Sequence, residues 1–184
     1  ILHLVDTSLL SQHFKTIVQY DIAEAQKAYH AAVYKGCVVM LGAALEGIML
    51  GTLQRPDVLM HFKVASSVPK PIRSIGNRDP ALPERIGNEL SFEDYKVCIH
   101  ALIPGSNALG VDNIQDFRNA IHPWKSIQEP IKYGAFDRSR ALHYVASLHK
   151  IVQALREWAP ESLQNKSLDV RGNEPTNSNG ITKS

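Results

Sequence analysis

Apolar and polar positions along the chain recur with the period of an α-helix in several long stretches. Four stretches carry apolar residues three and four positions apart, and they span residues 7–20, 21–53, 91–102 and 137–158. The last stretch has the most regular stripe, formed by Ala141, Leu142, Val145, Leu148, Val152 and Leu155. No stretch shows the strict alternation that is typical of a strand. The pattern therefore predicts an all-α domain.

The second of these stretches is apolar on almost every side between Tyr34 and Leu50, after a bend expected near residues 31–35. A helix without a polar face is typical of the centre of a bundle. Its small residues allow another helix to approach closely; they are Gly42, Ala43, Ala44 and Gly47. The apolar run is marginal in length for a membrane span and contains Lys35 and Glu46. We therefore expect a core helix and no membrane association.

Glu46 is the only carboxylate in that apolar run. Burying an ionised acid without a partner costs about several kcal/mol, so a buried Glu46 is either paired or protonated. Arg118 is the partner that we expect. The alternative is a partly exposed glutamate at the edge of a helix contact, and the sequence leaves both open.

Residues 55–88 have a different character, because five prolines break any long element there. One short helix is expected over residues 57–65. Basic side chains outnumber acidic ones in the stretch; they are Arg55, Lys63, Lys70, Arg73, Arg78 and Arg85. We predict an irregular excursion that either lies over a cleft and contacts phosphates or is a solvated surface loop.

The ends of the later helices are marked by polar residues and prolines. Ser91 and Asp94 have the spacing of a capping box, and Asp137 is placed to cap the last helix. Residues 160–184 are rich in Asn, Ser, Gly and Lys and are predicted to be a disordered tail. The expected organisation is a single domain over residues 1–159, built as an up-and-down bundle of about five helices.

Composition narrows the function classes only a little. A chain of 184 residues with 44% hydrophobic content can bury one core, and a net charge of +2 does not by itself indicate a nucleic-acid binder. Cys37 and Cys98 lie in apolar helical settings, which favours free thiols in a reducing cytoplasm. Neither a glycine-rich phosphate loop nor a metal-ligand spacing is present in the sequence, so no cofactor or metal is expected.

Arg118 and His122 are the pair of side chains in this sequence that could carry out a reaction. Their four-residue spacing puts both side chains on one face of a predicted helix, which Asp112 begins and Pro123 ends. A guanidinium suits phosphate oxygens, and an imidazole takes and gives a proton near neutral pH. The pair could therefore hold a phosphodiester and move the proton that its cleavage requires. Alternatively, both residues are structural: His122 interacts favourably with the partial negative charge at the C-terminus of the helix, and Arg118 pairs with a carboxylate.

Arg118-Asn119 followed by His122-Pro123 resembles the signature of the HEPN superfamily of nucleotide-binding helical domains. Many HEPN members are metal-independent ribonucleases, often in toxin–antitoxin or phage-defence systems. Their pattern has four to six residues between the Arg and the His, whereas three intervene here. The order of parts over residues 20–158 is also similar to that of HEPN domains.

This resemblance implies two hypotheses. In the first, the chain is an endoribonuclease with His122 as general acid or base, Arg118 on the scissile phosphate, Asn119 beside them and Glu46 orienting Arg118. A homodimer would then supply the second histidine, and an antitoxin could be a partner. In the second, it is a non-catalytic HEPN-type module that binds RNA, a nucleotide or a partner protein in a defence or regulatory assembly. A helical protein-interaction domain without a nucleotide role is a third possibility.

Overall fold

A computed structural model of the chain describes residues 7–64, 68–76, 79–103, 105, 127 and 136–158. Within these ranges the chain forms seven α-helices and no strand, which confirms the prediction of an all-α bundle. The helices are α1 (Gln12–His30), α2 (Tyr34–Leu53), α3 (Pro56–Val64), α4 (Lys70–Ser74), α5 (Leu82–Glu89), α6 (Phe92–Leu102) and α9 (Arg138–Glu157). The helix predicted around Asp112 and the tail predicted at residues 160–184 lie outside the described residues.

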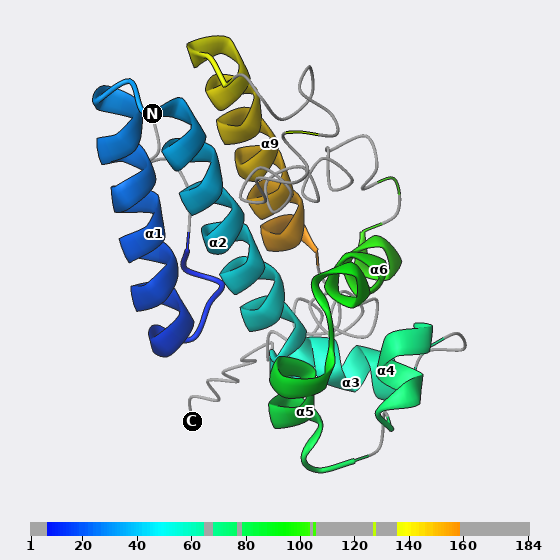
Figure 1. Ribbon diagram of the computed structural model, residues 1–184. Helices are drawn as coiled ribbons and strands as arrows, with labels where there is room; N and C mark the ends of the chain where they lie inside the picture. The colour runs from blue at the N-terminus through cyan, green and yellow to red at the C-terminus, as the bar shows by residue number, and fades with distance from the viewer. Residues whose placement is uncertain are drawn as a thin grey trace, which may run out of the picture.

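Helix α2 is the centre of the bundle. Figure 1 shows α1 along one side of it, α9 along the other, and α3 and α5 gathered near its C-terminal end. Of the ten largest fully buried side chains in the described part of the chain, five come from α2; they are Leu41, Leu45, Ile48, Met49 and Leu53. Burying one such side chain stabilises a protein by about 1.5–3 kcal/mol. The prediction of a central apolar helix is therefore confirmed.

The length and composition of α2 also meet the requirements for a membrane span, with a mean hydropathy of 1.8 over its most apolar window. However, 61% of that window is buried inside the bundle. A core helix of a soluble protein passes the same test, and the packing of α2 against its neighbours accounts for its apolar surface.

Helices α1 and α2 form a hairpin whose bounds differ from those predicted. The sequence pattern suggested a break at about Tyr20, but α1 runs without interruption from Gln12 to His30. Neither glycine nor proline occurs near that position, so nothing interrupts the backbone hydrogen bonds. The chain turns at residues 31–33, within the bend expected near residues 31–35, and Ala32 has a positive φ of 57° there.

Two glycines of α2 allow α1 to pack closely against it. A Cβ atom on Gly47 would lie 2.8 Å from Cγ2 of Val18, and a Cβ on Gly51 would lie 3.0 Å from Leu10 and Phe14 side-chain atoms. Real Cβ atoms do not approach another heavy atom to 2.8 Å. The backbone separation in this hairpin therefore depends on the missing side chain at Gly47.

The proline-rich segment is more ordered than predicted. It contains α3, α4 and α5, of which only α3 was expected. Pro56, Pro71 and Pro83 each occupy the first or second position of one of these helices. Proline is tolerated there because its missing N–H would have no partner in the helix and its fixed φ is close to the helical value. These prolines therefore begin short helices as well as ending long ones.

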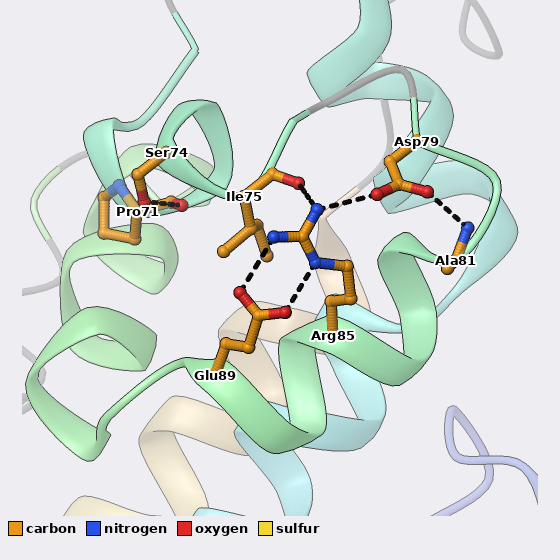
Figure 2. A network of polar contacts seen from close by, with 7 residues as sticks. All are labelled: Pro71, Ser74, Ile75, Asp79, Ala81, Arg85 and Glu89. Atoms are coloured by element: carbon orange, nitrogen blue, oxygen red, sulfur yellow. Dashed lines mark hydrogen bonds and ion pairs between the residues drawn. The ribbon is translucent and has the colours of Figure 1, made fainter.

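Arg85 holds this segment together, as Figure 2 shows. Its guanidinium donates to the Glu89 carboxylate at 2.6 and 2.9 Å, to the Asp79 carboxylate at 2.7 Å and to the Ile75 carbonyl at 2.7 Å. The Asp79 carboxylate also accepts from the backbone N–H of Ala81. One side chain thus links the end of α4, the turn before α5 and the last residue of α5.

The two predicted helix caps that lie within the described residues are confirmed. Asp94 and Ser91 exchange backbone and side-chain hydrogen bonds at the start of α6, and Asp137 accepts from the backbone N–H of Arg140 at the start of α9. Cys37 and Cys98 are buried and free, as predicted. Burial raises the thiol pKa of Cys37 to about 11 and that of Cys98 to about 12, so both remain protonated near neutral pH.

We expect Gly47→Ala to lower the free energy of unfolding by about 1 kcal/mol. Alanine gains about 1 kcal/mol of helix propensity over glycine, but the contact with Val18 adds an overpacking cost of about 1–3 kcal/mol. Chemical denaturation measures the change. In a Val18→Ala background the contact is absent, so the same substitution should stabilise the protein. A loss of equal size in both backgrounds would contradict close packing at this position.

The Arg85 contacts predict an acid-sensitive contribution to stability. Hydrogen bonds from Arg85 lower the pKa of Asp79 and of Glu89 below their ordinary values of 3.8 and 4.5. Carboxyl groups with lowered pKa stabilise the folded state above their ordinary pKa, and that stabilisation is lost as the pH falls through the folded-state values. The Tm of Arg85→Gln should therefore be lower than that of the unmodified protein at pH 7, and the gap should narrow below pH 3.8.

Arg73→Gln is the matched control, because it removes an exposed arginine from the neighbouring helix α4. Its Tm should stay within a constant offset of the unmodified protein over the same pH range. A gap for Arg85→Gln that does not change with pH would show that its carboxylate contacts contribute nothing.

Candidate functional site

The predicted site residues fall into two groups. Arg118, Asn119 and His122 lie outside the residues that the structure describes. Glu46 is described and lies on α2, where its side chain is partly exposed. This agrees with the second of the two expectations for Glu46, that of a glutamate at the edge of a helix contact.

Glu46 lies on α2, which packs against α6. Its charge acts on Tyr95, whose pKa is raised above 10.0 first by burial, then by the negative charges of Glu46 and Asp94. The Tyr95 hydroxyl donates to the Ile86 carbonyl at 3.2 Å, which fixes the ring between α5 and α6. Among the described residues, Glu46 has no hydrogen bond or ion pair. The negative charge of Glu46 on α2 therefore acts on a buried phenol of α6.

Lys96 is a buried cation that the sequence analysis missed. Its side chain is only 10% exposed, and its ammonium lies 2.9 Å from the carboxylate of Glu93, one turn earlier in α6. A buried lysine is uncommon unless it is paired. The sequence contains a pattern that indicates burial of Lys96. Lys96 lies four residues after Phe92 and three before Ile99, and both of these residues belong to the apolar stripe of α6. A lysine at such a position is expected to be at least partly buried.

Two cations of the proline-rich segment are already paired within the chain. Arg55 donates to both carboxylate oxygens of Asp57 and lies 5.9 Å from the ring centre of Trp158. The Trp158 ring also contacts His61, with ring centres 5.5 Å apart. Arg85 is paired with Asp79 and Glu89. These side chains therefore hold helices together, which favours a structural role for them over contacts with phosphates.

A groove of about 830 Å³ lies on the α1–α2 hairpin near its turn. Its lining includes Tyr20, Lys27, Lys35 and Met40, and Glu46 is not part of it. In the described part of the chain, no group of three or more His, Cys, Asp or Glu side chains is arranged to hold a metal ion.

The position of Glu46 can be tested through Tyr95. Removing the negative charge with Glu46→Gln makes the phenolate easier to form, so the pKa of Tyr95 should fall toward 10.0 while burial keeps it above that value. NMR titration of tyrosine labelled with ¹³C at Cζ measures it, with Tyr95→Phe for assignment. Glu24→Gln, on the opposite helix α1, should leave the titration unchanged. An unchanged Tyr95 in Glu46→Gln would mean that Glu46 points away from α6.

Comparison with known proteins gives one similarity. No family model and no solved structure matches the chain. A protein of Herpetosiphon aurantiacus named "Putative type II restriction enzyme HgiDII" is 40% identical over 167 residues. The match covers 88% of this chain and 27% of that protein, so the chain spans about a quarter of its length. A continuous match of this extent includes every helix from α2 to α9 and also Arg118 and His122.

Proposed function

We propose that the chain is a metal-independent endoribonuclease of the HEPN type that acts as a homodimer. The observation that carries the proposal is the similarity to a protein with a nuclease's name, over a region that includes Arg118, Asn119 and His122. The all-α bundle is compatible with a HEPN domain. Membership of that superfamily remains part of the proposal.

The chemistry follows from the pair of side chains. His122 takes the proton of a ribose 2′-hydroxyl, whose oxygen attacks the adjacent phosphorus. The bond from phosphorus to the 5′-oxygen breaks, and the partner subunit's His122 gives that oxygen a proton. The products are a 2′,3′-cyclic phosphate and a free 5′-hydroxyl. Proton transfer of this kind contributes about 10²–10⁴-fold to the rate.

Arg118 acts on the same phosphate. Its guanidinium neutralises the negative charge that develops on the phosphate oxygens as the 2′-oxygen attacks. Asn119 hydrogen-bonds the phosphate or fixes the imidazole. Glu46, which α2 holds in a partly exposed position beside α6, orients Arg118.

The greater length of the relative supports a second candidate function, that of a non-catalytic module. Since the chain corresponds to about a quarter of that protein, it could be a helical module of a larger nuclease or defence assembly. In that case Arg118 and His122 bind RNA, a nucleotide or a partner protein without cleaving anything. The cutting of DNA that the name of the relative denotes would then belong to other parts of such a protein.

Cleavage of single-stranded RNA in the presence of EDTA tests the first proposal. We expect fragments that end in 2′,3′-cyclic phosphate, while DNA of the same sequence stays intact because it lacks the attacking hydroxyl. His122→Ala should lower the rate by about 10²-fold or more. His13→Ala is the matched control, since it removes an exposed histidine from α1, and it should cleave at the unmodified rate.

Several outcomes would contradict this mechanism. They are cleavage that persists in His122→Ala, cleavage that requires a divalent metal, and cleavage of DNA. Binding of RNA without cleavage by a dimeric preparation would favour the module instead. Light scattering coupled to gel filtration gives the oligomeric state, and a monomer with full activity would exclude a shared site.

A further inference from the structure

Helix α9 carries mostly basic side chains on its exposed face, as the much shorter helix α4 also does. Five basic or titratable side chains of α9 are exposed; they are Arg138, His143, His149, Lys150 and Arg156. Its only acidic residue is Glu157, at the last position, where the carboxylate accepts from Gln153. The acidic residue before the helix, Asp137, accepts from the backbone N–H of Arg140. The exposed face therefore carries the positive charges of Arg138, Lys150 and Arg156, and no carboxylate before Glu157.

The opposite side of α9 is fixed in the core. Eight residues of α9 are buried; they are Ala141, Tyr144, Val145, Ser147, Leu148, Ile151, Val152 and Leu155. With about 100° between successive residues, Arg138, His149 and Arg156 share one edge of the exposed face. His143 and Lys150 share the other edge, and Ser139, Ala146, Gln153 and Glu157 lie between the two rows. The first row extends along about 27 Å of helix and the second along about 10 Å.

Elsewhere, many cations of the described chain are held by nearby carboxylates. Lys27 lies 2.6 Å from Glu24 on α1, Arg55 pairs with Asp57, and Arg85 pairs with Asp79 and Glu89. By contrast, Arg138 of α9 donates to a neutral group, the Tyr29 hydroxyl, at 2.9 Å. This contact orients the guanidinium without cancelling its charge.

We propose that the exposed face of α9 binds the sugar-phosphate backbone of a nucleic acid. The inference rests on the proposed function, because a nuclease must hold its polymer, and it adds a binding surface outside the Arg118–His122 pair. The length of α9 corresponds to about nine base pairs of duplex at 3.4 Å each. The basic rows do not present a set of hydrogen-bonding groups that would read base edges. They therefore favour contacts with phosphates, which do not depend on the base sequence of the nucleic acid.

Binding measurements at several salt concentrations test the surface. The probes are a fluorescent 20-residue duplex DNA and a single-stranded 2′-O-methyl RNA, which the proposed 2′-hydroxyl attack cannot cleave. We expect Lys150→Gln/Arg156→Gln to weaken binding by roughly tenfold and to lower the slope of log K against log salt by about 2, one for each phosphate contact. The polymer with the larger change identifies the form of nucleic acid that α9 contacts.

Lys27→Gln/Lys35→Gln is the control, because it also removes two exposed cations, here from the α1–α2 hairpin. Figure 1 shows α2 between α1 and α9. The control should keep the affinity and the salt slope. Equal losses in the two double variants, or no binding of either probe by the unmodified protein, would overturn the proposal. Lys150→Gln alone, with an expected slope change of about 1, replaces the double variant if that fails to fold.

Failure of this proposal can be separated from failure of the proposed function. If His122→Ala abolishes RNA cleavage while the α9 variant binds normally, the ribonuclease stands and the α9 surface is wrong. If the α9 variant loses binding while the unmodified protein cleaves no RNA, the surface stands and the catalytic mechanism is wrong.

Discussion

The burial of α2 is the constraint on which the rest of this structure depends. Helix α2 has twenty residues with apolar side chains on nearly every side, and exposing any of these sides to water is unfavourable. Its apolar surface is removed from water only if other helices surround it. The helices that pack against it are α1, α3, α5, α6 and α9. The short helices near its C-terminal end add cover where α1 and α9 do not reach (Figure 1). The topology of the bundle thus follows from one segment.

Much of this fold could be predicted from local sequence patterns. The central helix, the capping box at Ser91, the cap at Asp137 and the stripe of α9 all depend on residues close together in the chain, and each was predicted. The bend expected near residues 31–35 is present at residues 31–33, whereas the additional break expected at about Tyr20 is absent, because α1 continues through that position. Two short helices after α3 were missed because proline was taken only as a breaker, whereas here it also occupies first turns.

The candidate site was less accessible to sequence reasoning. The contacts of Glu46 depend on how α2 and α6 pack, and no local pattern gives that orientation. The pairing of Arg55 with Asp57 follows from adjacent positions, but its contact with Trp158 joins residues about a hundred positions apart. Lys96 could have been found, since a lysine within an apolar stripe is visible in the sequence. Arg118, Asn119 and His122 are outside the described residues, so their mutual arrangement remains a prediction.

The order in which α2 gains its neighbours has a consequence for how the chain folds. Helix α1 is joined to α2 by three residues, so their contact closes a short loop and can form early. Helix α9 reaches α2 only after more than eighty intervening residues, so its docking closes a long loop and is expected late. Until α9 arrives, one apolar side of α2 faces water. Nascent or truncated chains that end after α6 would therefore expose apolar surface of α2 and tend to aggregate.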